Sequence, residues 1–458
     1  MKTVTTWSPA AQPASRSQPT SGPSRRACLA GAGTLVGSAV LAACGAGQPA
    51  APGAALSTPV TLSYVSVLPA TNPEAAGWLD ALQDWNPQND KISLRLDDAQ
   101  GATDITKLKA MLAANTIPDL MMTGYRGDPA DLYNLGATID VETELKTEKD
   151  WDRQRADIFP GYLETSRWAG KLVAIPCHGT CQAMIYSPDL LQRAGLTAPK
   201  ERWTWNDFLT MARKVARPPD VWGLDLNWSY VFWAMWVGSN GARPLTKDNR
   251  RLTLSTPQVQ EATTFMLDLV RGGVAPPESS AELIGKGQTA FEHQGSYRIA
   301  PLRQSGTSFG VIHMPIKTEL FVSASGYSAL VPRNVAPERR HASALVAKWL
   351  NAPAQQAKLC ARSLSQPVSK AATEHKIIRD LMAADPQAKG FLELAPYAWR
   401  WPNLPSFGKL GPVLATAVGD ILGQKIGVND GLARAERDGQ LFLDDDARTA
   451  AEANAASK

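Results

Sequence analysis

Few residues of this chain have the types and spacing that could carry out chemistry. The stretch "CHGTC", residues 177–181, places His178 between Cys177 and Cys181 and so offers three potential metal ligands. Two buried thiols beside a histidine of a binding cleft are the alternative, which we favour, and we predict no metal site. A local disulfide is a further alternative, but it requires a turn, because an extended strand holds the two Cα atoms beyond the roughly 7 Å limit.

Three other patterns resemble catalytic motifs but lack the required context. "GTSFG" matches a nucleophile elbow around Ser308, yet the following "VIHMPI" predicts a strand where that motif needs a helix. "GKGQ", residues 285–288, lacks both the first glycine and the hydroxyl residue of a phosphate-binding loop. Asp97 and Asp98 are more typical of a solvated strand end than of a glycosidase acid and base. The sequence therefore contains no strong catalytic motif, and we predict no catalytic residue and no cofactor.

The first 44 residues have the pattern of an export signal. They contain four basic residues and no Asp or Glu, and an apolar run of small residues follows the basic part. "SRRACL", with Arg25 and Arg26, resembles a twin-arginine signal, and an ordinary secretory signal with two arginines is the alternative. We expect a signal peptide and a location outside the cytoplasm.

"LAAC" at the end of this segment resembles a bacterial lipobox, in which the thiol of Cys44 is lipidated. Acyl chains contribute about 0.8 kcal/mol per buried methylene, so lipidation would hold a domain on the periplasmic or outer face of a membrane without a spanning helix. Residues 45–58 are rich in Gly, Ala and Pro and poor in large apolar side chains, which predicts a flexible tether.

Composition excludes one class of partner. The whole chain has 47 Lys plus Arg and 43 Asp plus Glu, so without the four basic residues of the signal the two numbers are equal. A basic groove for nucleic acid is therefore not indicated. The remaining residues, about 400 by length, normally divide into two domains.

The strands and helices that the sequence predicts must position any functional site. Residues 60–67 and 92–96 have the two-residue period of strands. Helices are predicted from capping and spacing signals at residues 204–217, 256–272 and 340–353. This pattern predicts an α/β protein with parallel-sheet units.

Four segments in order resemble family 1 extracellular solute-binding proteins of ABC importers. They are "DITKLKAMLAANTIPDLMMTGY", "GKLVAIPCHGTCQAMIYSPDLLQRAGLTAPKERWTWNDFLTMARKV", "GKGQTAFEHQGSY" and "SASGYSALVPRNVAPERRHASALVAKWLNAP". The resemblance covers residues 59–445. It implies a two-lobed periplasmic-binding-protein (type II) fold whose lobes close around a ligand.

That resemblance implies a lipoprotein that captures a sugar, oligosaccharide or polyol and delivers it unchanged to an ABC permease. We expect a monomer with no nucleic-acid partner. Two alternatives remain: a surface-anchored carbohydrate-active enzyme, and a binding protein for a glycerol phosphate-type ligand, for which Arg126 and Arg298 are candidates. The expected lobes are residues 59–180 plus 309–363 and residues 181–308 plus 364–458, with hinge crossings near 177–186, 305–310 and 362–370.

Sugar clefts need flat aromatic platforms and polar groups that bind hydroxyls. Tyr297 matches the stacking aromatic of the family, and the other candidates follow predicted strands or lie on the first crossing. Trp233 and Trp236 recur at helical spacing and are predicted to be core. The expected ligand-binding residues are Asn72, Glu74, Tyr125, His178, Gln182, Trp228, Tyr297, Tyr327 and Trp399.

Overall fold

The computed structural model describes residues 56, 58–65, 79–80, 82–96, 105–124 and 128–456, and the account below concerns these residues. The predicted signal peptide, Cys44 and the tether up to residue 55 lie outside them. So do three of the expected ligand-binding residues, Asn72, Glu74 and Tyr125, together with Arg126. Within the described ranges, no helix combines the length and apolar character needed to cross a bilayer.

Nine strands of the described chain join one mixed sheet, with the order β2-β1-β3-β10-β6-β8-β7 and with β11 beside β10 and β9 beside β6. A separate two-stranded hairpin, β4–β5, precedes β6. The strand bounds are β1 (Val60–Val65), β2 (Ile92–Leu96), β3 (Leu120–Gly124), β4 (Arg167–Trp168), β5 (Lys171–Leu172), β6 (Ile175–Tyr186), β7 (Trp222–Asp225), β8 (Thr289–Gly295), β9 (Gly310–Ile312), β10 (Val322–Leu330) and β11 (Ala398–Trp399).

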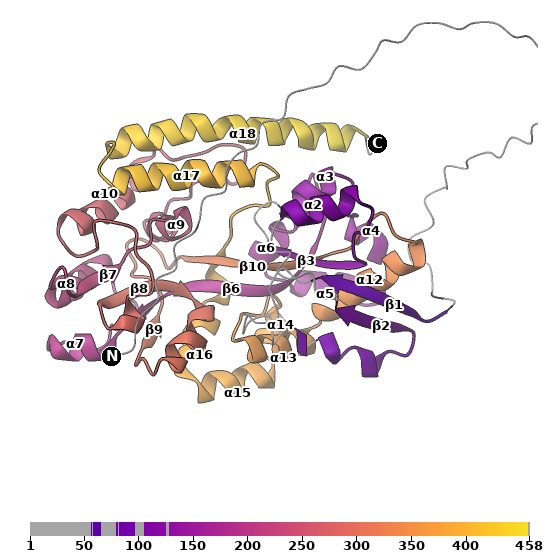
Figure 1. Cartoon of the computed structure of the whole chain (residues 1–458), viewed down its shortest axis with the longest axis horizontal. Helices are drawn as coiled ribbons and strands as arrows, with labels where there is room; N and C mark the ends of the chain where they lie inside the picture. The colour runs from indigo at the N-terminus through magenta and orange to yellow at the C-terminus, as the bar shows by residue number, and fades with distance from the viewer. Residues whose placement is uncertain are drawn as a thin grey trace, which may run out of the picture. The chain divides into compact units, whose positions relative to one another are not determined.

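The two long strands β6 and β10 join the halves of this sheet (Figure 1). β10 pairs with β3 through its last residues and with β6 along most of its length, both antiparallel. The second half of β6 pairs instead with β8 and β9. The predicted first crossing, 177–186, falls within β6, whereas residue 310 begins β9, which pairs with the second half of β6 along the edge opposite to β8. The lobe boundaries and the three crossings stay predictions.

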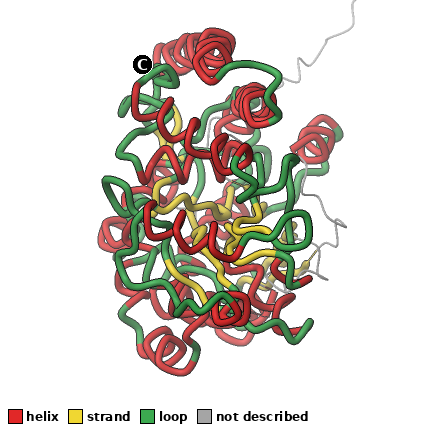
Figure 2. Tube along the Cα trace, turned by 90° about the vertical axis from the view of Figure 1, so that its left-hand side faces the viewer, coloured by secondary structure: helices red, strands yellow, loops and turns green. Residues whose placement is uncertain are grey.

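Helices surround the strands (Figure 2). Figure 1 shows α2 and α3 on one side of β1 and β3, and α12 on the other. The α-helices are α2 (Ile105–Ala113), α3 (Asp128–Asn134), α4 (Val141–Leu145), α5 (Trp151–Asp157), α6 (Pro160–Glu164), α7 (Pro188–Arg193), α8 (Trp205–Val215), α9 (Tyr230–Ser239), α10 (Pro257–Arg271), α11 (Ile299–Gln304), α12 (Pro337–Leu350), α13 (Pro353–Ser363), α14 (Lys370–Thr373), α15 (Lys376–Ala384), α16 (Pro386–Leu392), α17 (Phe407–Leu422) and α18 (Val428–Ala456). Single 3-10 turns are η1 (Asn86–Gln88), η2 (Ile284–Lys286), η3 (Ser296–Arg298) and η4 (Ala395–Tyr397).

Local signals in the sequence predicted several of these elements correctly. α8 begins with the expected capping box, in which Thr204 accepts from the Asp207 amide at 3.2 Å and its own amide donates to the Asp207 carboxylate at 2.8 Å. α10 has Pro257 in its first turn and ends at Gly272, as predicted. The third predicted helix, 340–353, is present as α12, but it begins and ends three residues earlier, at Pro337 and Leu350.

The core consists of apolar clusters on both halves of the sheet. The largest surrounds α8, α9, α10 and α17, and a second one lies between β1, β3, α12 and α13. Trp233 and Trp236, with 1% and 0% exposure, are confirmed as core side chains of α9. All ten residues of α9 are buried, as is typical of a helix that is apolar on nearly every face.

The "CHGTC" segment is extended, which decides between the alternatives for its cysteines. Cys177 and Cys181 lie four residues apart in β6, a separation of roughly 13 Å along a strand. Both are buried and free. Burial raises the pKa of the Cys181 thiol to about 12, although hydrogen bonds with Gln366 and Tyr162 lower it in part. The thiols are therefore structural and unreactive at neutral pH.

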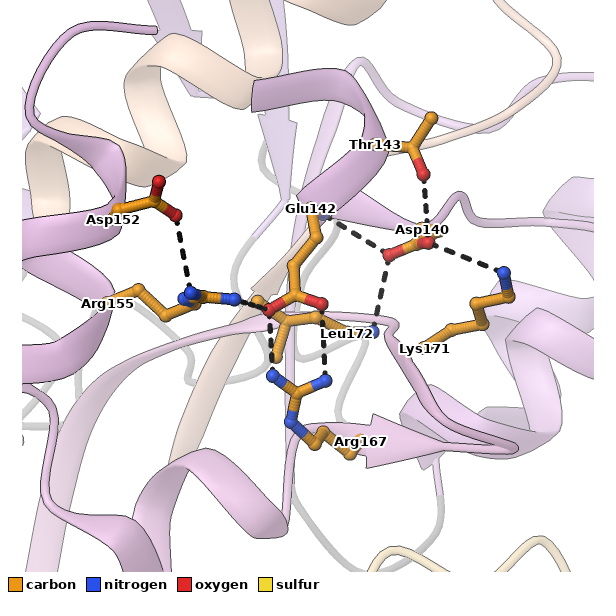
Figure 3. A network of polar contacts seen from close by, with 8 residues as sticks. All are labelled: Asp140, Glu142, Thr143, Asp152, Arg155, Arg167, Lys171 and Leu172. Carbon is orange, nitrogen blue, oxygen red and sulfur yellow. Dashed lines mark hydrogen bonds and ion pairs between the residues drawn. The ribbon is translucent and has the colours of Figure 1, made fainter. Parts of the chain in front are cut away.

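A polar network fixes the β4–β5 hairpin that leads into β6 (Figure 3). The Glu142 carboxylate of α4 accepts from Arg155 at 2.5 Å and from Arg167 at 2.7 Å. Burial of Glu142 raises its pKa, but the bonds from the two arginines outweigh it, so the pKa lies below its usual value. The Asp140 carboxylate accepts from the Leu172 amide at 3.3 Å. These contacts tie α4 and α5 to the β4–β5 hairpin, which directly precedes the strand that carries the candidate site.

Candidate functional site

A cavity of about 670 Å³ lies where the two halves of the sheet meet. Its volume is in the range of small-molecule binding sites, roughly 300–1,000 Å³. Residues from strands, helices and one 3-10 turn line it: Gly124, Asp128, Thr180, Gln182, Tyr230, Tyr297, Ser325, Tyr327, Phe407, Gly408, Gly411, Pro412 and Ala415.

The paired strands β6 and β10 supply the polar surface of this cavity. Thr180 and Gln182 are two residues apart and therefore share one face of β6. Ser325 is opposite Thr180 in the antiparallel register, and Tyr327 follows on the same face of β10. The side-chain oxygen Oε1 of Gln182 is buried and has no hydrogen-bond partner among the described residues. An acceptor in that position favours a ligand with hydroxyl or amide donors.

His178 lies beside the cavity and not on its wall. It shares the face of Thr180 and Gln182, is 2% exposed, and its ring centroid lies 5.2 Å from that of Tyr327. The histidine therefore packs beside the Tyr327 ring.

Tyr297 reaches the cavity from the short turn η3, which directly follows β8. Its hydroxyl donates to Oε1 of Gln294 at 2.6 Å, and its side chain is 44% exposed. A Cβ atom added to Gly295 would lie 2.5 Å from the Tyr297 ring and 2.9 Å from the Thr180 methyl. The glycine is therefore needed for the ring to lie against β6.

The first half of α17 forms a smooth wall of the cavity. Gly408, Gly411, Pro412 and Ala415 are spaced as one helix face, and none has a large side chain. Tyr230 at the start of α9 packs beside this face, where an added Cβ at Gly411 would lie 3.4 Å from its ring. The small residues leave the space that the cavity occupies.

The described part of the cavity wall is nearly uncharged. Asp128 is its one ionisable carboxyl group, and no Lys, Arg or His side chain lines it among the described residues. Arg298, which was considered for binding a phosphate, is 7% exposed and pairs with Glu292 at 3.2 Å and Glu282 at 3.3 Å. Its charge is thus compensated within the protein.

The structure brings together only part of the predicted binding set. Gln182, Tyr297 and Tyr327 line the cavity, and His178 packs beside Tyr327. Trp228 lies beside Gly423 at the far end of α17, roughly 18 Å along the helix from Gly411. Trp399 packs on Phe321 and Trp401 at 5.6 and 5.1 Å. Whether any of these residues contacts a ligand stays a prediction.

The sequence analysis did not identify most of the other residues that line the cavity. Asp128, Thr180, Tyr230, Ser325 and Phe407 gave no separate signal, because each is an ordinary residue type in a strand or at a helix end. The small face of α17 could have been found, since small residues recur at positions 408, 411, 412 and 415. That this face of α17 points toward the cavity depends on tertiary packing, which the periodicity of the sequence does not show.

A mixed α/β sheet in two halves, with a cavity between them, defines the class of a two-lobed binding protein. Solved structures agree: a cyclic alpha-maltosyl-1,6-maltose binding protein from Arthrobacter globiformis aligns with a TM-score of 0.75 at 20% identity, over 84% of this chain and 99% of that one. UgpB from Mycobacterium tuberculosis, in complex with glycerophosphocholine, aligns with a TM-score of 0.71 at 17% identity, over 84% and 98%. At these identities the likeness shows the fold alone.

Residues 80–390 match the bacterial extracellular solute-binding protein family, and the chain belongs to that family. A probable ABC transporter-binding protein of Deinococcus radiodurans is 25% identical over 185 residues, which are 34% of this chain. A binding protein of Brucella abortus is 25% identical over 197 residues, 42% of this chain. The matches span 42% and 45% of the length of these relatives.

Proposed function

We propose that this protein binds an uncharged sugar, oligosaccharide or polyol and presents it to the permease of an ABC importer. The cavity carries the proposal: three tyrosines and Phe407 supply flat rings, while Thr180, Ser325 and Gln182 supply hydroxyl and amide groups. Rings stack on the C–H faces of sugars, and the polar groups bind hydroxyls. The family assignment and the binding of sugars by several structural neighbours support the same class of ligand.

An anionic ligand is the second candidate, since one structural neighbour is in complex with glycerophosphocholine. The described wall does not favour it. Asp128 would repel a phosphate, and Arg298 is already paired with two carboxylates. A glycosidase would need a second carboxyl group about 5–10 Å from the first, and the described wall contains only Asp128. We therefore propose binding without chemistry.

A thermal-shift series with the purified protein tests the proposal. Maltose, maltotriose, trehalose and sorbitol are compared with glycerophosphocholine, and the solution is analysed for products afterwards. At a ligand concentration 100-fold above Kd, binding adds about 2.7 kcal/mol to the stability of the folded state. We expect stabilisation by a neutral member of the panel, which is recovered intact. Stabilisation by glycerophosphocholine alone would move the assignment to phosphodiesters, and turnover would replace transport with catalysis.

We further propose that the protein is exported, lipidated at Cys44 and held at the membrane as a monomer. The lipobox-like "LAAC" and the basic, acid-free first 44 residues support this proposal. Membrane fractionation of the producing bacterium provides the test. Cys44→Ala is expected to move the protein into the soluble extracytoplasmic fraction, and Cys28→Ala serves as the control. A variant that stays in the membrane fraction would refute the anchor and leave the ligand proposal intact.

A further inference from the structure

Two aromatic rings of the cavity wall meet at an angle. Tyr230 is the first residue of α9 and Phe407 is the first residue of α17, so the two rings belong to different helices. Their centroids lie 5.9 Å apart, and their planes are inclined by 59°. Both side chains are buried, so each ring presents only a small part of its surface to the cavity. We name this pair, Tyr230 and Phe407, the aromatic corner.

The two helices alone do not fix the aromatic corner. A helical side chain packs over the turn that precedes it, and the first residue of a helix has no such turn. Helix ends also fray. Ser406, the N-cap of α17, makes no side-chain capping bond within the helix and donates instead to Asp446 of α18 at 2.5 Å. The positions of both rings therefore depend on tertiary contacts.

The buried indole of Trp401 contacts both rings of the aromatic corner. Its centroid lies 5.4 Å from that of Tyr230, at an interplanar angle of 80°, and 5.5 Å from that of Phe407, at 61°. These are edge-to-face contacts, which aromatic pairs prefer over a face-to-face sandwich. Trp401 is 0% exposed and is not among the described residues that line the cavity. It therefore acts on the cavity only through the side chains that it contacts.

Trp401 is itself anchored to a strand that carries part of the cavity wall. Trp399 packs edge-to-face against it, with 5.1 Å between the ring centroids, and pairs through its backbone with Ser323 of β10. The intervening Arg400 is buried, and its guanidinium lies 4.5 Å from the ring centroid of Tyr162. The indole thus connects the aromatic corner to β10, which supplies two further residues of the wall.

Trp401 contributes its shape and not a hydrogen bond. Its Nε1 has no hydrogen-bond partner among the described residues. A leucine at this position would leave unfilled space beside both rings, and the surrounding side chains relax only partly into such space. The aromatic corner would then lose the contact that its two rings share.

We propose that Trp401 is a positioning residue, which holds Tyr230 and Phe407 in the cavity wall and thereby sets the affinity for a sugar. The effect on a sugar rests on the proposed function, whereas the positioning of the rings does not. Stacking on the C–H face of a sugar requires a ring in a defined place and orientation. Movement of the aromatic corner therefore removes contact area from two rings at once.

Trp236 provides a matched control. Like Trp401, it is a fully buried tryptophan whose Nε1 lacks a hydrogen-bond partner among the described residues. Its ring contacts, none of which lines the cavity, are Trp205, Phe208, Phe265 and His293. Trp236→Leu and Trp401→Leu should lower Tm by similar amounts, because each removes a fully buried indole. Only Trp401→Leu should disturb the aromatic corner.

Nuclear magnetic resonance with labelled tyrosine and phenylalanine rings tests the positioning without a ligand. The nuclear Overhauser cross-peak between the ring protons of Tyr230 and Phe407 reports how close the two rings lie, and Tyr230→Phe and Phe407→Leu assign it. Trp401→Leu should lower its intensity at least twofold, whereas Trp236→Leu should leave it unchanged. Trp401→Phe keeps an aromatic ring at the contact and should retain most of the intensity.

Calorimetry provides the ligand arm, at a temperature well below the Tm of every variant. The probes are maltose, maltotriose, trehalose and sorbitol. For any of them that binds the wild type, Trp401→Leu should raise Kd at least tenfold. Trp401→Phe should stay within threefold of the wild type, and Trp236→Leu within twofold.

Three results would overturn the proposal. They are a Tyr230–Phe407 cross-peak that is unchanged in Trp401→Leu, a Kd that is unchanged in this variant, and equal losses of affinity in Trp401→Leu and Trp236→Leu. If Trp401→Leu does not fold, Trp401→Met takes its place with the same expected changes, because a flexible methionine fills more of the space. If none of the four probes binds, the proposed function fails, and the cross-peak still decides the positioning.

Discussion

Gly326 offers the sharpest test of how β6 and β10 hold the cavity. It is opposite Gly179 in the register, between Ser325 and Tyr327 of the cavity wall. A Cβ atom added at position 326 would lie 2.1 Å from the backbone oxygen of His178. Side-chain carbons do not approach backbone oxygens closer than about 3.0 Å, so Gly326→Ala must push the strands apart by roughly 0.9 Å.

The expected loss of unfolding free energy follows from the overpacking and from the hydrogen bond that is stretched when the strands separate. Overpacking typically costs about 1–3 kcal/mol, and a buried ladder hydrogen bond stretched by this amount loses about 1 kcal/mol more. The smaller conformational entropy of the unfolded alanine chain returns about 0.4–1 kcal/mol. The net expectation is a loss of about 2–3 kcal/mol. At about 2.1 cal/mol/K per residue, a folded domain of roughly 400 residues loses about 1 °C of Tm for each 0.8 kcal/mol.

Differential scanning calorimetry should therefore show Gly326→Ala melting about 2–4 °C below wild type. Gly419→Ala is the matched control, because an added Cβ there, inside α17, meets nothing within 4 Å. Alanine is the better helix former by about 1 kcal/mol, so this control should melt at or slightly above the wild-type temperature. A Gly326→Ala protein that melts with wild type would refute the close contact between the two strands.

Three further outcomes are expected. Thr204→Ala removes the cap of α8 and should cost about 1 kcal/mol in thermal melts, with Thr210→Ala in the same helix as a nearly neutral control; equal losses would contradict the capping role. Burial raises the pKa of Asp446 to about 6, so its contribution to stability is largest below about pH 4 and is lost as the pH rises through 6. The difference in Tm between wild type and Asp446→Asn should change over this interval, and a constant difference would count against the shift. Tyr297→Ala should weaken sugar binding at least tenfold while Trp228→Phe leaves it within twofold; the reverse ranking would place the site elsewhere.

Signals that act within a few residues allowed prediction of the elements. The capping box at Thr204, Pro257 in the first turn of α10 and the helical spacing of Trp233 and Trp236 were all read correctly. Each depends on backbone groups or on one helix face, which the neighbouring residues determine. The ordered likeness to a family then predicted the two-lobed fold that the comparisons show.

The site was predicted only in part, because strand ends show where a ligand can bind and not which side chains converge. Trp228 follows a strand as expected, yet the path of the chain into α9 carries it to the far end of α17. Tyr297, predicted as the stacking aromatic, lines the cavity because Gly295 has no Cβ to keep its ring away from β6. Its contact with a ligand stays a prediction. Arg298 resembled a phosphate ligand in the sequence, but in the structure it lies against Glu292.

By itself, the sequence determined the class of fold, the starts of α8 and α10 and the family, since these depend on local patterns and on the order of segments. Only the tertiary structure decided that Cys177 and Cys181 stay apart, because β6 is extended there. It also decided that the described part of the cavity wall carries a single carboxyl group, that of Asp128, and that Arg298 pairs with Glu292. Those properties depend on strand pairing between residues more than 100 positions apart, such as Thr180 and Ser325, which local pattern does not encode.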